Sequence, residues 1–215
     1  MKISAVFLGF IIVFITINAA DVIAIEQAAI NNNSIGLKEV QTTGPLEQLK
    51  QLTSLPLAKG TFEQRKYFTV LKQPIVSTGE LHFDQELGLI WQTHYPISSV
   101  LRLKNSGLYM QDAVSAEREV KGAGTMTQVL MNALSGNVSA LENEFSFQSS
   151  TQSTCISLLP KENLLANIMQ TIDLCMVDNK LSSIVLFEHS GNRTEIDINL
   201  SALTELPEAI SAQLQ

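Results

Sequence analysis

Apolar and polar residues alternate along much of the chain between residues 61 and 111, with turn residues about every ten positions. This pattern predicts strands over residues 61–68, 78–84, 89–93, 99–104 and 108–111. Because the turns between them are short, consecutive strands should pair antiparallel. A second set of strands is expected over residues 154–159, 171–177, 181–189 and 193–200. The pattern therefore favours antiparallel sheet over parallel βαβ units.

Helical patterns lie before, between and after the two sets of strands. Thr125 and Gln128 form a capping-box pattern, and Gly136 stands where a helix begun at Thr125 should end. Ser139 and Glu142 form a second capping box, which predicts another short helix. Further helices are expected over residues 45–55, 162–169 and 203–215. The first of these rests on leucines at every third position, namely Leu46, Leu49, Leu52 and Leu55.

The N-terminus has the pattern of a secretory signal peptide. Lys2 precedes an almost unbroken apolar run from Val6 to Ile17, and small residues follow it. Because the run is shorter than the ~20 apolar residues of a membrane span, we expect residues 1–20 to be removed, with cleavage near residues 20–24. An uncleaved anchor is the alternative. Residues 25–43 predict a flexible lead-in, and residues 44–215 a single domain.

Two cysteines, Cys155 and Cys175, fall on the first two strands of the second set. In an exported protein such a pair predicts a disulfide, and two buried free thiols are the alternative. The chain also has three histidines, but their scattered positions lack the spacing of zinc ligands, so no metal is expected.

Charge and motif content exclude several classes of function. The net charge is −7, and removal of Lys2 with the signal leaves 13 basic and 21 acidic residues and a net charge of −8. A chain this acidic is a poor ligand for nucleic acid. It has no phosphate-binding loop and no glycine-rich dinucleotide loop, so no cofactor is expected. It also lacks a recognisable arrangement of nucleophile, base and orienting group, so we do not expect an enzyme.

Large apolar side chains recur on one face of the predicted strands and on the predicted helix over residues 125–136. We call the following the candidate lining residues: Phe62, Leu81, Phe83, Leu89, Trp91, Leu101, Leu103, Met110, Met126, Leu130 and Leu134. One interpretation is an ordinary core of a sheet packed on its helices. The other is an incompletely filled curved sheet that encloses a lipid-sized apolar cavity. The periodicity is the same in both cases.

Two stretches of the chain resemble the outer-membrane lipoprotein carrier (LolA-like) family, in a divergent branch. The first contains Gly60-Thr-Phe62-Glu-Gln64-Arg-Lys66, Pro74-Ile-x-Ser77-x-Gly79-x-Leu81-x-Phe83, Gly88-Leu-Ile-Trp91 and Tyr95-Pro96. The second contains Ala133-Leu134-Ser135-Gly136-x-x-x-Ala140-Leu141-Glu142-x-x-Phe145, Leu158-x-Pro160-Lys161 and Glu188-x-x-Gly191-x-Arg193-Thr194-x-Ile196. The order and spacing of these motifs carry the resemblance from Gly60 to Leu200.

The resemblance implies a mainly β (α+β) fold, in which a curved antiparallel sheet forms an open half-barrel closed by helices that act as a lid. It also implies a soluble, monomeric periplasmic carrier. Such a protein would take an acylated protein or lipid from an inner-membrane donor complex to an outer-membrane acceptor. Alternatives are an envelope interaction module with a filled core and an accessory protein of a lipid, glycolipid or polyene biosynthesis pathway.

The chain departs from the family pattern at two places. The arginine next to a proline in the strand before the tryptophan is absent, and Asp84-Gln85-Glu86 occupies the matching region. Cys155 stands where the branch usually has a tryptophan. These departures leave the cargo open between a lipoprotein and another acyl product.

Overall fold

The computed structural model describes residues 45–51, 54–104, 106–120, 124–150, 154–161 and 164–215. The predicted signal peptide and lead-in lie outside these residues. The described strands form one antiparallel sheet of eleven strands in the order β6-β5-β4-β3-β2-β1-β11-β10-β9-β8-β7. In chain order they are β1 (Leu57–Tyr67), β2 (Ile75–Asp84), β3 (Gly88–Tyr95), β4 (Ser99–Lys104), β5 (Gly107–Asp112), β6 (Arg118–Glu119), β7 (Phe145–Ser149), β8 (Cys155–Pro160), β9 (Met169–Val177), β10 (Lys180–Glu188) and β11 (Arg193–Ala202).

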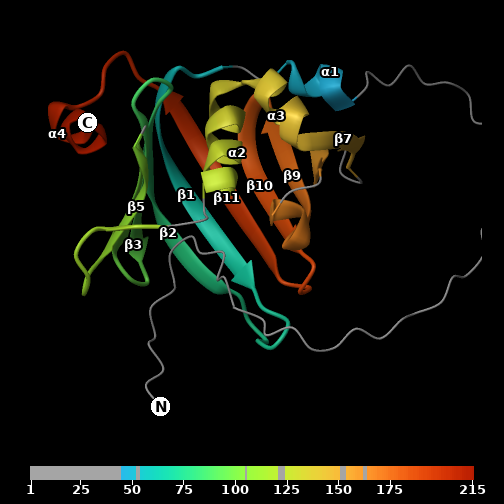
Figure 1. The fold of residues 1–215 in the computed structure, drawn as a ribbon, viewed down its shortest axis with the longest axis horizontal. Coiled ribbons are helices and arrows are strands. Elements are labelled where there is room, and N and C mark those ends of the chain that lie inside the picture. Colours follow the sequence, from blue (N-terminus) through green and yellow to red (C-terminus); the bar gives the residue numbers. More distant parts are fainter. Residues whose placement is uncertain (1–44, 52–53, 105, 121–123, 151–153, 162–163) are drawn as a thin grey trace, which may run out of the picture.

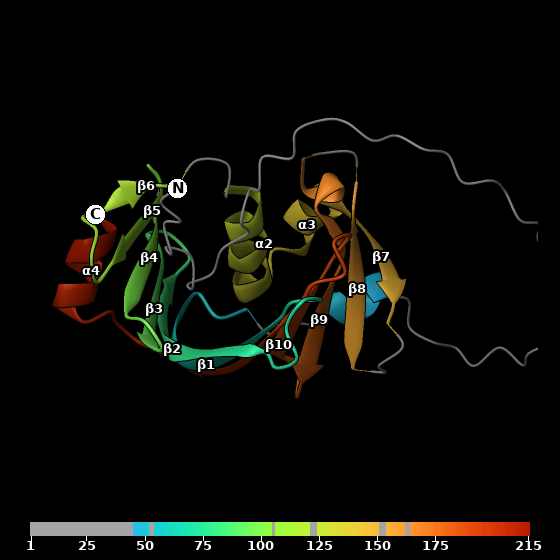
Figure 2. The same ribbon diagram turned by 90° about the horizontal axis from the view of Figure 1, so that it is seen from below.

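The sheet is an open half-barrel built from the two predicted sets of strands. Each set is a meander, and the two meet where β1 pairs with β11 from Ala58 opposite Ala202 to Tyr67 opposite Arg193. The edge strands of the described sheet are β6 on one side and β7 on the other. Figure 2 shows the resulting curve, with a concave and a convex face. The predicted fold class is confirmed.

Helices lie on both faces of this sheet. On the concave face, α2 (Gly124–Ser135) and α3 (Val138–Glu144) stand within the curve (Figures 1 and 2). The short α1 (Pro45–Leu49) contacts β7 and β8. The C-terminal α4 (Glu208–Leu214) packs outside the curve against β3 and β4. No described helix is long and apolar enough to cross a bilayer.

Several predicted helix boundaries are wrong. The helix expected over residues 45–55 ends at Leu49, because a spacing of three residues drifts by about 60° per step around an α-helix and gives no fixed apolar face. The helix expected over residues 162–169 is a 3₁₀ turn, η1 (Leu164–Asn167). The cap of α3 is Asn137 instead of Ser139, since the Asn137 side chain accepts a hydrogen bond from the Ala140 amide at 3.3 Å. Two strands, β6 and β7, were not predicted.

Candidate functional site: the concave face and its helix

The concave face of β1 to β5 carries two continuous rows of apolar side chains. Alternate residues of a strand point to the same face, so register decides which residues meet. In one row Gly60, Leu81, Trp91, Leu101 and Met110 lie opposite one another on successive strands. In the other, the neighbours are Ala58, Phe83, Leu89, Leu103 and Leu108. This half of the sheet therefore presents an almost unbroken apolar surface.

An aromatic stack lies at the centre of this surface. The rings of Phe62 and Trp91 are stacked with their centroids 4.0 Å apart, although they belong to β1 and β3. Gly79 on the intervening strand makes the stack feasible, because a Cβ there would lie 2.8 Å from the Phe62 ring and 1.9 Å from the carbonyl oxygen of Gln92. Gly79, which belongs to the sequence motif, thus leaves the space that the Phe62 ring occupies.

Strands β8 to β11 extend the apolar surface across the other half of the sheet. Their concave side chains belong to the same hydrophobic cluster as the residues on β1 to β5. The sequence analysis predicted these strands but proposed no lining residues on them. The alternation in residues 155–198 carries the signal, since every second residue there is apolar: Ile156, Leu158, Ile172, Leu174, Ile184, Leu186, Ile196 and Ile198.

One helix, α2, covers the centre of the concave face. Its side chains Val129, Leu130, Ala133 and Leu134 are 1–4% exposed and belong to the same cluster as the sheet residues. The backbone of α2 comes near that of β5. The helix is therefore seated on the sheet through the side chains of its apolar stripe.

The convex face is polar where the two halves of the sheet meet. The Arg65 guanidinium donates hydrogen bonds to Glu63, Glu195 and Asp197, at 2.5, 3.2 and 2.6 Å. These carboxylates, led by Asp197, raise the pKa of Arg65 above its usual value. On the opposite, concave face, near the end of β1, Lys66 donates a hydrogen bond to Glu188. At this junction the convex face is therefore charged, whereas Phe62 and Ile198, opposite each other on β1 and β11, make the concave face apolar.

No protein-family model matches this chain, and no curated protein matches it. Solved structures with a similar arrangement include a LolA superfamily protein from Nitrosomonas europaea, with a TM-score of 0.48 and 11% identity over 77% of this chain and 94% of that chain. They also include a DUF1329 family protein from Desulfovibrio piger, with a TM-score of 0.46 and 10% identity over 80% of this chain and 96% of that chain. In fold, the chain is similar to LolA superfamily proteins.

The curved sheet brings the described candidate lining residues together. All of those whose side chains are described lie in one cluster, and Leu103 is the partly buried member. The others are 0–7% exposed. The side chain of Met126 lies outside the described part of α2. The described apolar side chains of α2 are buried in this same cluster and cover part of the concave face.

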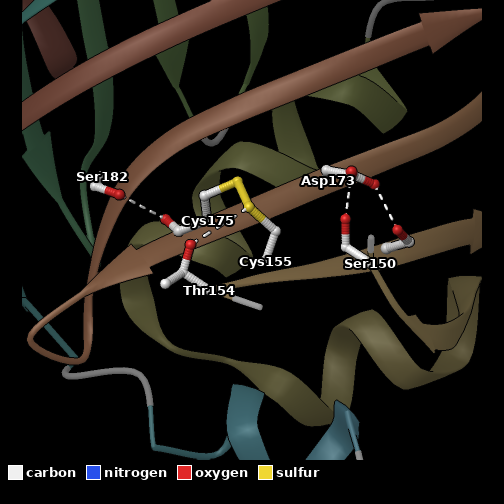
Figure 3. The surroundings of a disulfide bond; sticks show 7 residues. Ser150, Thr154, Cys155, Asp173, Cys175 and Ser182 are labelled. Carbon is white, nitrogen blue, oxygen red and sulfur yellow. Dashed lines mark hydrogen bonds between the residues drawn. A yellow bond between two sulfur atoms is a disulfide. The ribbon is translucent and has the colours of Figure 1, made fainter. Parts of the chain in front are cut away.

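The two cysteines lie together on the convex side of the sheet. Cys155 on β8 is directly opposite Cys175 on β9, and a disulfide joins them (Figure 3). On the same face, Asp173 accepts hydrogen bonds from Ser150 at 3.0 Å and Ser157 at 2.6 Å. The disulfide fixes two strands of the sheet and takes no part in the concave surface. Within the described residues, no group of three or more His, Cys, Asp or Glu side chains could hold a metal ion.

Proposed function

We propose that this protein is a periplasmic carrier for acyl chains, which it binds between the concave face of the sheet and α2. One observation carries the proposal. A continuous apolar surface spans both halves of a curved sheet, and α2 packs its apolar side chains over the centre of that surface. Displacing that helix would expose a trough of the chemistry that an acyl chain needs. No catalytic group is required for this task.

Replacing the side chains of α2 on the sheet by an acyl chain should change the free energy only slightly. A buried methylene contributes about 0.8 kcal/mol, so a dodecyl chain contributes about 10 kcal/mol if fully buried. Uncovering the apolar stripe of α2 costs about 1.5–3 kcal/mol for each large side chain. Since α2 buries Val129, Leu130 and Leu134 on the sheet, the gain and the cost have similar size. A carrier needs this balance, because it must release its cargo as well as bind it.

The proposed route runs from the inner to the outer membrane. The cargo is an acylated protein or a lipid, handed over by an inner-membrane donor complex and received by an outer-membrane acceptor. The predicted signal peptide would place the protein on this route, and the charged convex face would keep it in solution between the two membranes.

Weakening the packing of α2 on the sheet should strengthen acyl binding. Leu134 lies on the buried side of α2 and is 2% exposed. Leu134→Ala should therefore weaken the closed state, in which α2 packs on the sheet, by about 2–5 kcal/mol if the site does not collapse. Because the apparent dissociation constant falls as the open state becomes more populated, affinity for a fluorescent acyl probe should rise about tenfold or more. The measurement is a fluorescence titration of purified mature protein.

The matched control is Leu214→Ala. Leu214 is 4% exposed and also packs a helix on the sheet, but on the convex face. This variant should lose stability without any change in probe affinity. Equal affinities for Leu134→Ala and the parent protein would contradict the proposed coupling between α2 and the trough.

A filled-core interaction module is the second candidate function. It is favoured by the low exposure of the candidate lining residues, which is at most 7% for those in the buried core. It predicts that neither the parent protein nor Leu134→Ala binds an acyl probe, and that native mass spectrometry finds no lipid on the purified protein.

A further inference from the structure

A cavity of about 330 Å³ lies between α2 and α3. Its lining residues are Gln128, Val129, Asn132, Ala140, Leu141, Glu144 and Phe145. The volume is within the range of small-ligand sites. Its walls come from the two helices and the first residue of β7, so it lies beside the sheet surface described above, and Val129 belongs to both.

A tight connection between the helices shapes this cavity. Gly136 ends α2 with a φ of +67°, a left-handed conformation that glycine adopts readily. Asn137 then caps α3 through its side chain, and its amide donates to the carbonyl oxygen of Asn132 at 2.8 Å. Because no further residues separate the helices, α2 and α3 form a fixed corner, and the cavity lies inside it.

The cavity has an apolar floor and a polar mouth. Val129, Leu141 and Phe145 are 4%, 1% and 1% exposed and belong to the cluster that also contains Leu130 and Leu134. The polar lining residues are Gln128, Asn132 and Glu144, of which Gln128 and Glu144 are exposed and so lie toward the mouth. Asn132 is 9% exposed, so its amide lies at the border between the mouth and the core. A site of this kind suits an amphiphile, with its polar end outward and its apolar end toward the core.

We propose that this cavity receives the polar head of the amphiphile whose acyl chain lies under α2. This inference rests on the proposed function. The two amides both donate and accept hydrogen bonds, whereas the carboxylate of Glu144 accepts them and repels a negative charge. The site therefore selects a head that carries hydroxyl or ammonium groups over a carboxylate head.

Two probes with the same chain and opposite head charge test this selection. Dodecylamine and laurate compete with a fluorescent acyl probe for the parent protein and for Glu144→Lys. We expect dodecylamine to bind the parent protein about tenfold more tightly than laurate, and Glu144→Lys to reverse the order. The control is Glu142→Lys, which makes the same change of net charge on the same helix at a residue outside the cavity lining. Like the parent protein, this control variant should bind dodecylamine more tightly than laurate.

The outcomes separate this inference from the function on which it rests. If both probes bind but Glu144→Lys and Glu142→Lys have equal effects, the preference reflects net charge alone. The proposed head site is then wrong, whereas the proposed acyl-carrier function is not contradicted. If neither probe binds the parent protein or Leu134→Ala, the proposed function fails and the head site fails with it. Thermal unfolding of each variant tests whether the two lysine substitutions, both on α3, leave the fold intact.

Discussion

Replacing Trp91 by alanine should lower the free energy of unfolding by about 3–5 kcal/mol. Trp91 is 2% exposed, lies between Leu81 and Leu101 across the strands, and stacks on Phe62. Truncation removes this contact area and leaves a cavity in the concave core, between paired strands that cannot easily move together to close it. The effect is measured as the shift in the urea midpoint at constant slope.

The control for this experiment is His94→Ala on the same strand. The His94 side chain is 49% exposed, and its contact is with Glu80 at 3.5 Å on the surface. Its replacement should change the free energy of unfolding by less than about 0.5 kcal/mol. If Trp91→Ala cost no more than His94→Ala, the aromatic stack would not be part of a packed concave core.

Removing the disulfide should lower the free energy of unfolding by about 3 kcal/mol. Cys155 and Cys175 are 20 residues apart in sequence, and the cross-link restricts a loop of that length in the unfolded chain. The double variant Cys155→Ala/Cys175→Ala is compared with the parent protein by urea unfolding. Because both cysteines lie on the convex side, affinity for an acyl probe should not change.

A reducing agent supplies the control for the disulfide. It should destabilise the parent protein by the same amount as the double substitution and leave the double variant unaffected. A double variant as stable as the oxidised parent would mean that the link between β8 and β9 contributes nothing beyond the pairing of the strands.

The sheet could be predicted from the sequence because its signal is local. Alternation in residues 78–84 and 99–104 fixed which side chains share a face, and short turns fixed the antiparallel order. The same reasoning placed Cys155 and Cys175 on neighbouring strands. The strand β7 was missed because Phe145 follows a helix and fits its apolar spacing. It pairs with Pro160, a partner that no local pattern could identify.

The state of the concave face could not be predicted from the sequence. Leu130 and Leu134 give the same helical stripe whether they line a void or fill it. The answer depends on how deeply α2 sits in the curve, which is a property of the whole sheet. The cavity between α2 and α3 was missed for a related reason. Its polar residues Gln128, Asn132 and Glu144 come from two helices whose crossing is set by the corner at Gly136 and Asn137.

Hydrogen exchange of the α2 amides, with and without a saturating acyl probe, tests the central claim most directly. The account predicts that binding lowers the protection of the helix over Gly124–Ser135, because the chain takes the place of its apolar stripe on the sheet. The helix over Glu208–Leu214 on the convex face serves as the internal reference and should not change. Binding of the probe with unchanged or increased protection of α2 would contradict displacement of this helix by the acyl chain.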